Sequence, residues 1–206
     1  MDNNTPIKKK ILKTAAKIFA EYGFEGARMD QIAKAADVNK ASIYYNIGNK
    51  KALYEKVLVE TIRPALNEFT IKLKHIQEPK KKLKAYINNI GKALIDNPHI
   101  SKIIMREQAS KGKNLPELFA VNIAEVLNTL DSILQQGKDE QIFEEVDTLT
   151  IHFMILATLM FQISSAPIRK EKKAFPKKYH PRQDEDFSHV IENITKYILK
   201  AVCKGE

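Results

Sequence analysis

The sequence predicts an all-α fold: an N-terminal three-helix helix-turn-helix head, joined by a long helix to a larger C-terminal helical bundle. Apolar residues recur along the whole chain at the three- and four-residue spacing of amphipathic helices. Alternating strand patterns and the Asn-Gly or Asp-Gly turns of hairpins are absent. A chain of 206 residues can form two small domains. We expect the head over residues 1–48 and the body over residues 49–206.

The first helix is expected to begin with Thr5 as its N-cap and Pro6 at its first position. Gly23 should end this helix, because glycine readily adopts the left-handed conformation of a C-cap. Phe24 would then fold back on Phe19, which is the apolar contact of a Schellman-type cap. The helix would brace the two shorter helices that follow.

Residues 29–46 have the spacing of two short helices joined by a tight turn. Met29, Ile32, Ala33 and Ala36 make the inner face of the first helix, and Asn39 is a favoured N-cap for a second helix that runs to about residue 46. This arrangement places a second helix in the major groove of DNA, which is about 12 Å wide. The residues expected to face outward are Lys40, Ala41, Ser42, Tyr45 and Asn46.

Two lysines at the start of the next helix favour the same partner. Asn49 can cap a helix that begins with Lys50 and Lys51. The helix dipole disfavours cations at this end but favours a bound phosphate. Solvated lysines are the alternative, and the preceding motif favours the phosphate. Residues 1–54 also contain 10 basic and 5 acidic residues, so they carry +5 of the net charge of +9.

The segment from Ala33 to Leu53, AKAADVNKASIYYNIGNKKAL, resembles the DNA-binding domain of the TetR family of bacterial transcriptional regulators. The close similarity extends over residues 7–58. It implies that Ser42, Tyr45 and Asn46 face the major groove or its flanking phosphates. It also implies that Tyr44 and Lys50 hold the DNA backbone.

Four positions depart from the usual pattern of the TetR family. Arg28 stands where a capping threonine is usual; it can reach a phosphate but cannot cap. Asp37 replaces a glycine, and aspartate is among the few residues that visit left-handed backbone geometry. Asn46 replaces a common histidine and Ile47 a usual phenylalanine. Because Asn46 changes the possible base readout, no operator sequence follows from the resemblance.

The fourth helix is expected from about Lys50 to Ile76, with a kink at Pro64, which removes a backbone donor and crowds the carbonyl one turn earlier. Two roles are open for this kink, a hinge that transmits movement and a static bend that fits the core. The later segments are expected to start or stop at Pro79, Asn97-Pro98, Leu115-Pro116, Gly137 and Pro167.

The last two long helices predict a homodimer. Residues 148–163 are apolar nearly all round, and the helix from Phe187 to Val202 has a continuous apolar stripe. Together they carry more apolar surface than a small monomer readily hides. The resemblance implies an interface formed by these two helices, with Leu156, Leu159, Met160, Val190, Ile191, Ile194 and Ile198 as its expected residues.

A dimer would present two heads to a palindromic operator whose half-sites lie about 34 Å apart or a multiple of that distance. A ligand that widened this separation would release the DNA. The family implies repression as the default. The sequence therefore predicts a ligand-responsive repressor. The alternative is a helical protein-interaction or anionic-membrane-surface module without sequence-specific DNA binding.

A small effector is expected between the middle helices of the body, where bundles keep apolar cavities. Its candidate contacts are His99, Met105, Arg106, Phe119, His152, Phe153 and Phe161. Each of these residues also suits an ordinary core or surface position, and Arg106-Glu107 can simply be exposed. The aromatic and methionine content favours an apolar or aromatic effector.

Other chemistry is not indicated. The five histidines have no metal-ligand spacing, and neither a phosphate loop nor a Gly-x-Ser-x-Gly elbow is present. We therefore predict no metal, no cofactor and no enzymatic activity.

Cys203, the single cysteine, suits a reducing cytosol. No signal peptide is predicted, and the apolar segment 149–163 is shorter than the roughly 20 residues of a membrane helix. A cytoplasmic protein with a buried helix there is expected.

The segment from Arg169 to Arg182 is basic and is expected to form a mobile loop between the last two long helices. It contains seven basic residues and one acidic residue, with Phe175, Tyr179 and His180 interleaved. A second contact with nucleic acid is conceivable here, because affinity for phosphate increases with the number of basic contacts. A solvated loop is the alternative.

Overall fold

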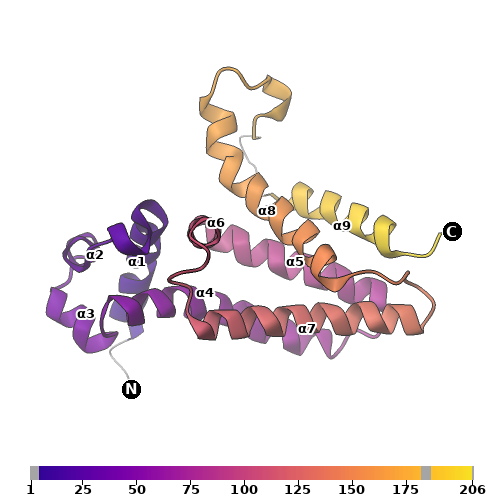
Figure 1. The fold of residues 1–206 in the computed structure, drawn as a ribbon, viewed down its shortest axis with the longest axis horizontal. Coiled ribbons are helices and arrows are strands. Elements are labelled where there is room, and N and C mark those ends of the chain that lie inside the picture. The colour runs from indigo at the N-terminus through magenta and orange to yellow at the C-terminus, as the bar shows by residue number, and fades with distance from the viewer. Residues whose placement is uncertain (1–4, 182–186, 206) are drawn as a thin grey trace. The chain divides into compact units, whose positions relative to one another are not determined.

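A computed structural model of the chain is helical outside its turns, which confirms the all-α fold (Figure 1). It describes residues 5–181 and 187–205, without the side chains of residues 5, 61, 62, 64 and 65. In these ranges the only extended pairing is an isolated bridge between Phe143 and Cys203. The elements are α1 (Thr5–Gly26), α2 (Met29–Ala36), α3 (Lys40–Asn46), α4 (Lys50–Leu73), α5 (Pro79–Asp96), α6 (Pro98–Ala109), α7 (Glu117–Asp139), α8 (Thr148–Glu171), η1 (Lys177–Tyr179) and α9 (Ser188–Val202).

The chain packs as two compact units. The first unit comprises residues 1–64 and 99–122, and the second comprises residues 65–98 and 123–206. One boundary lies inside α4, directly after Pro64, and α6 belongs to the same unit as α1, α2 and α3. This is a division by packing rather than by function. The assignment of DNA binding to residues 1–48 and of ligand binding and dimerisation to residues 49–206 therefore remains a prediction.

The core of the first unit joins α1, α2 and α3, which lie side by side (Figure 1). Ile11, Phe19, Ile32 and Ile43 are fully buried there. The four residues predicted to form the inner face of α2 are all buried, and α2 and α3 have the expected bounds. Helices as short as α2 and α3 are not stable in isolation, so their position depends on this shared core.

The end of α1 differs from the expectation. Gly23 has φ 71° and ψ 177°, whereas a left-handed cap has ψ near 47°. The chain therefore kinks at Gly23 and continues as a helical turn to Gly26. Phe24 nevertheless returns to Phe19, with ring centroids 6.3 Å apart. The cap expected of Thr5 lies outside the described side chains.

The fourth helix ends at Leu73, three residues earlier than expected, because residues 74–75 form a turn. The side chain of Pro64 is not among those described, so both readings of its kink remain predictions.

Gly137 and Pro167 do not end helices, contrary to expectation. Gly137 lies inside α7 at a point where a Cβ would collide with the ring of Phe143, and Pro167 lies inside the last turns of α8. At this position proline removes one helical hydrogen bond and crowds the carbonyl one turn earlier.

The second unit is built around α5, α8 and α9, which contact one another pairwise. Gly91 permits the close approach of α9, since a Cβ at this position would lie 2.5 Å from Cδ1 of Ile191. Tyr86 on α5 and His152 on α8 are both buried, and the Tyr86 hydroxyl lies 2.8 Å from Nδ1 of His152. This hydrogen bond satisfies two polar groups that would otherwise be costly to bury.

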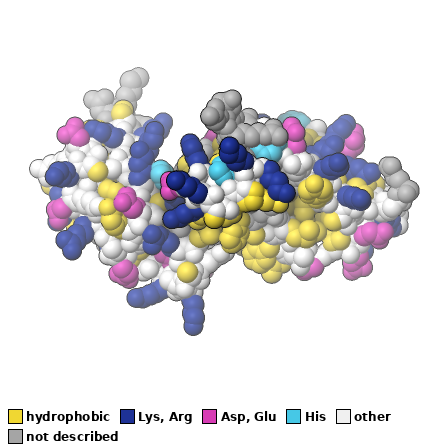
Figure 2. Space-filling model, turned by 90° about the horizontal axis from the view of Figure 1, so that it is seen from above, with side chains coloured by type: hydrophobic (Ala, Val, Ile, Leu, Met, Phe, Trp, Pro, Cys, Tyr) yellow, Lys and Arg dark blue, Asp and Glu magenta, His cyan; other side chains and the backbone are white. Residues whose placement is uncertain are grey.

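Most of the residues expected at the dimer surface pack inside the subunit. Leu156 is half-buried. The other residues expected at that surface are buried within the subunit itself: Leu159, Met160, Val190, Ile191, Ile194 and Ile198. The helix was expected to be buried, but it exposes an apolar face consisting of Leu149, Phe153, Met154, Phe161 and Ile168. We call this set the α8 apolar face. Figure 2 shows hydrophobic side chains gathered on one area of the surface, beside a group of Lys and Arg side chains.

Helix α8 is also long and apolar enough to cross a membrane, by length and composition. Only 28% of its most apolar window is buried. The helix nevertheless packs against α5 and α9 through Ile151, Ile155 and Leu159 and carries the buried, hydrogen-bonded His152. One such helix is weak evidence for a membrane span, since a helix of a soluble core passes the same test.

Candidate nucleic-acid interface

The turn between α2 and α3 has the geometry that the sequence predicts. Asp37 adopts φ 51° and ψ 55°, the left-handed conformation expected where glycine is usual. Its N–H donates to the Lys34 carbonyl at 3.1 Å, and the Val38 N–H donates to the Ala33 carbonyl at 3.0 Å. Arg28 occupies the N-cap position of α2 and makes no side-chain cap hydrogen bond. The prediction that Arg28 cannot cap is confirmed.

Two asparagines fix the starts of the next two helices. Oδ1 of Asn39 accepts from the Ala41 N–H at 2.9 Å, and Oδ1 of Asn49 accepts from the Ala52 N–H at 3.0 Å. Both caps are as predicted from the sequence. A cap of this kind contributes about 1 kcal/mol to helix stability. The caps therefore define where α3 begins and how it joins α4.

The outer face of α3 is available to a partner. Ile43 is fully buried and anchors the helix, whereas Tyr45 is 88% exposed and Tyr44 is 47% exposed. Lys40 and Ala41 are also exposed. The α3 face defined by these exposed residues is the candidate surface for DNA.

Ser42 and Asn46 lie one turn apart on α3 and are hydrogen-bonded to each other. Nδ2 of Asn46 donates to the Ser42 carbonyl at 2.7 Å and lies 3.1 Å from Ser42 Oγ. Both side chains are half-buried. The carboxamide oxygen of Asn46 is therefore the atom left to accept a hydrogen bond from a partner.

Two lysines of the predicted DNA-binding set, Lys40 and Lys50, have partners within the protein. The Lys40 ammonium lies 2.9 Å from the Asp30 carboxylate, and this hydrogen bond raises the pKa of Lys40. Nζ of Lys50 donates to the Glu25 carbonyl at 3.1 Å and lies 4.8 Å from the centroid of the Phe24 ring. Exposed pairs such as Lys40–Asp30 contribute little, so a phosphate can compete for that lysine. Lys50 also ties the start of α4 to the end of α1.

Helix α6 supports the head through Arg106. Nε of Arg106 donates to the Ala20 carbonyl at 3.1 Å, and Nη2 donates to the Glu21 carbonyl at 2.7 Å. These carbonyls lie near the kink at Gly23, where helical carbonyls lack partners and the helix dipole favours a cation. Arg106 is exposed, in agreement with the solvated alternative, and it joins α6 to α1. Its role as an effector contact stays a prediction.

The second support is a buried hydrogen bond that no local sequence pattern predicts. The hydroxyl of Tyr54 on α4 donates to the Glu107 carboxylate on α6 at 2.7 Å, and Glu107 is only 4% exposed. Burial and this carboxylate both raise the pKa of Tyr54, so the phenol stays protonated. The Asn114 N–H also donates to Glu107, at 3.1 Å. The exposed position considered for Glu107 is therefore wrong.

The seven effector candidates are divided between the two units. His99, Met105, Arg106 and Phe119 lie in the first unit, whereas His152, Phe153 and Phe161 lie in the second. Phe119 is buried, and Phe153 belongs to the α8 apolar face. Phe161 lines a surface hollow of about 330 Å³ with Phe175 and Tyr179. Among the described residues, no group of three or more His, Cys, Asp or Glu side chains could hold a metal ion.

Comparison with known proteins identifies both parts of the chain. Residues 11–57 match the family of bacterial regulatory proteins called tetR, and residues 79–171 match the tetracyclin repressor-like C-terminal domain. The chain is 29% identical over 162 residues to the HTH-type transcriptional repressor NicS of Pseudomonas putida, which covers 75% of this chain and 74% of NicS. It is 25% identical over 198 residues to the regulator RutR of Escherichia coli K12, which covers 95% of this chain and 90% of RutR.

Solved structures share the fold. The transcriptional regulator FadR from Bacillus subtilis, in complex with stearoyl-CoA, superposes with a TM-score of 0.66 at 20% identity and covers 93% of this chain and 97% of FadR. The head geometry, the two family matches and the regulator relatives agree with one another. The chain belongs to the tetR family of bacterial regulatory proteins and is a DNA-binding transcriptional regulator, not an enzyme.

Proposed function

We propose that the protein is a cytoplasmic repressor that binds a palindromic operator as a homodimer and is released by a small effector. The observation that carries this proposal is the α3 face, where Tyr45 is 88% exposed beside the fully buried Ile43. A rigid short helix with exposed side chains on one face suits entry into a major groove. The residues proposed to contact DNA are Arg28, Lys40, Ala41, Ser42, Tyr44, Tyr45, Asn46 and Lys50.

The α8 apolar face supports the homodimer. Phe161 is 62% exposed, and Phe153 and Met154 on the same helix are 49% and 44% exposed. Several exposed apolar residues on one helix commonly mark an interface, and most homo-oligomers are two-fold dimers. We place the dimer contact on this face together with the exposed Tyr197 of α9. Two heads related by a two-fold axis would read an inverted repeat.

The contacts of α6 support regulation. Arg106 and Glu107 hold α1 and α4 respectively, so a shift of α6 would move the head helices. A ligand with different affinities for two positions of α6 would then shift the population of DNA-binding states. We assign α6 as the element that transmits effector binding to the head.

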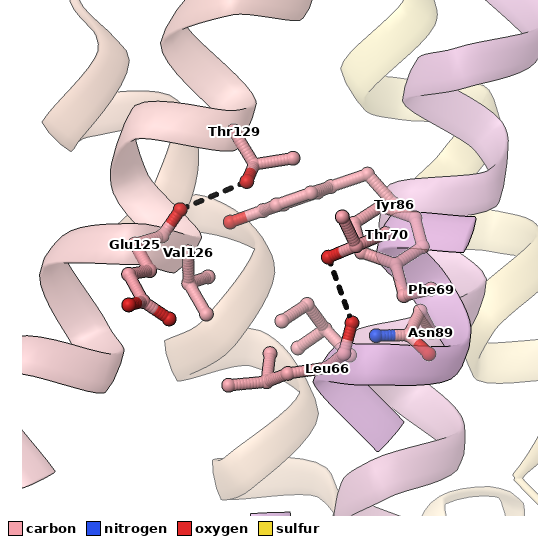
Figure 3. Close-up of a pocket in the computed structure, with 9 residues that line it drawn as sticks. Leu66, Phe69, Thr70, Tyr86, Asn89, Glu125, Val126 and Thr129 are labelled. Carbon is pink, nitrogen blue, oxygen red and sulfur yellow. Dashed lines mark hydrogen bonds between the residues drawn. The ribbon is translucent and has the colours of Figure 1, made fainter. Parts of the chain in front are cut away.

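The effector site is proposed to lie in the second unit. One small cavity there has a volume of about 30 Å³ and is lined by residues of α4, α5 and α7 (Figure 3). This volume suits roughly one water molecule. An effector would have to enlarge it or occupy a neighbouring space. FadR of Bacillus subtilis, a protein of the same fold, was solved in complex with stearoyl-CoA, which supports a ligand with an apolar part.

The basic segment 169–182 remains a candidate for a second contact with DNA. Arg169 folds back onto α8 and η1, donating to the carbonyls of Gln162 at 2.9 Å and Tyr179 at 3.0 Å. Residues 170–179 are exposed, and Arg182 lies outside the described residues. Deletion of residues 169–178 should reduce the salt dependence of DNA binding if this contact exists. An unaltered salt dependence would remove it from the proposal.

Selection of bound DNA from a random pool tests the proposed function. The full chain should enrich an inverted repeat, and a panel of small apolar and aromatic compounds should contain members that release that DNA. Failure to enrich any sequence at moderate salt, together with binding to anionic vesicles, would contradict the proposal and support a membrane-surface module.

A further inference from the structure

A surface groove between α4 and α5 has features of a ligand site that the small cavity lacks. Its volume is about 450 Å³, which lies in the range of small-molecule sites. Its apolar residues are Phe69, Ile76 and Ala85. Its cationic side chains are Lys72 from α4 and Lys92 from α5, and His75 lies beside them.

Lys72 on α4 and Lys92 on α5 both line the groove, and both act on the carboxylate of Glu68. The Lys72 ammonium lies 2.6 Å from the exposed Glu68 carboxylate. Lys72 first, and Lys92 to a smaller degree, lower the pKa of Glu68. An anionic group is thus favoured between the two lysines. The groove lining contains two lysines and no acidic residue, and the exposed ion pair of Lys72 with Glu68 is weak enough to be displaced.

Phe69 separates the groove from the small cavity. Its side chain lines both spaces, as does Asn89. Phe69 is 5% exposed, and its ring packs edge-on against Tyr86 at 5.9 Å. In Figure 3 the Tyr86 side chain crosses the small cavity towards Glu125 and Thr129. A ligand in the groove therefore rests on the same ring that closes the cavity.

The threonines of the small cavity offer no free hydroxyl proton to a ligand. Thr70 donates to the Leu66 carbonyl at 2.9 Å, and Thr129 donates to the Glu125 carbonyl at 2.8 Å (Figure 3). The only cationic side chains that line either space are those of the groove. The charged part of a ligand would accordingly stay outside, and its apolar part would face Phe69.

We propose that the α4–α5 groove binds a small organic anion with an apolar body, whose carboxylate lies between Lys72 and Lys92 and whose body covers Phe69, Ile76 and Ala85. Charge complementarity selects the anion, and the apolar floor selects its body. The role of this anion as the effector rests on the proposed function. The binding of the anion to the groove does not depend on the proposed function.

Calorimetric titration of the full chain with three eight-carbon probes tests the site. Octanoate should bind at least about tenfold more tightly than octanol, and octylammonium should not bind, because only octanoate complements the lysines. Lys92→Gln should weaken octanoate binding roughly fivefold, the upper end of what one exposed ion pair contributes. Lys84→Gln, a change to another exposed lysine of α5 that does not line the groove, should leave the affinity unchanged.

A second variant fills the groove. Ala85→Leu should remove octanoate binding while the thermal unfolding midpoint stays close to that of the unmodified chain, because Ala85 is only half-buried.

Equal binding of octanoate and octanol, or equal loss in Lys92→Gln and Lys84→Gln, would overturn the site. The same samples are titrated with DNA: intact DNA binding without octanoate binding refutes only this inference, whereas absent DNA binding refutes the proposed function. Octanoate binding that leaves DNA affinity unchanged would overturn its role as effector.

Discussion

The hydroxyl of Tyr54 donates a hydrogen bond of 2.7 Å to the carboxylate of Glu107, which is 4% exposed. The bond joins α4, which follows α3, to α6. Arg106, the residue before Glu107 on α6, donates to two carbonyls near the end of α1. Phe19 packs edge-on against the same tyrosine ring, with centroids 4.8 Å apart. One buried polar contact thus lies within the aromatic core of the head and fixes α6 to it.

Tyr54→Phe should lower the free energy of unfolding by about 1 kcal/mol, because it removes a buried hydrogen bond while Glu107 keeps its other donors. Urea denaturation gives this value. Tyr44→Phe provides the control, since its hydroxyl belongs to a side chain that is 47% exposed. Equal stability of Tyr54→Phe and the unmodified protein would show that the contact does not hold α6 in place.

Tyr45→Ala should reduce affinity for the selected DNA by at least about tenfold, the scale of one lost specific contact. Its unfolding free energy should change by less than about 0.5 kcal/mol, as is usual for a surface substitution. Fluorescence anisotropy with labelled DNA measures the affinity. Tyr22→Ala removes a tyrosine of α1 that is 45% exposed and serves as the control. Similar losses in both variants would argue against the α3 face as the contact surface.

Phe153→Glu should convert the dimer to a monomer, because it places a charge in the α8 apolar face. Sedimentation velocity measures the change. Ile71→Glu introduces the same charge at an apolar residue of α4 that is 62% exposed, and it should leave the dimer intact. A Phe153→Glu protein that still sediments as a dimer would place the interface elsewhere.

The buried His152 predicts a loss of stability in acid. Burial lowers the pKa of His152 below its ordinary value of 6.5. The unfolded chain therefore binds a proton that the folded chain excludes, and this contribution to stability is present above pH 6.5 and declines as the pH falls below it. Urea denaturation from pH 7.5 to pH 5 should show a smaller decline for His152→Gln than for the unmodified protein, with His75→Gln as an exposed control. Parallel declines in all three proteins would contradict this assignment.

Local signals in the sequence predicted the head in detail. Asn39, Asn49 and Asp37 act through their own neighbouring backbone, so their roles can be inferred without knowledge of tertiary contacts. Gly23 was only partly predictable, because its positive φ follows from its residue type, whereas its ψ depends on how α1 meets the rest of the unit.

Contacts between distant segments were not predictable in this way. Glu107 resembles a surface residue in its local sequence, and its burial depends on a tyrosine 53 positions away. Apolar periodicity located α8 and α9 but could not say which apolar side chains pack inside the subunit. Ile194 and Leu159 therefore proved to be core residues, while Phe153 lies on the surface.

The arrangement of two heads on one operator is the central claim, and a spacing experiment tests it most directly. The affinity of the full chain is measured for the selected inverted repeat and for versions in which five base pairs are inserted between the half-sites. Five base pairs turn one half-site by about half a helical turn, so the account predicts a loss of affinity on the order of 100-fold, to that of a single half-site. Equal affinity for both spacings would contradict the account.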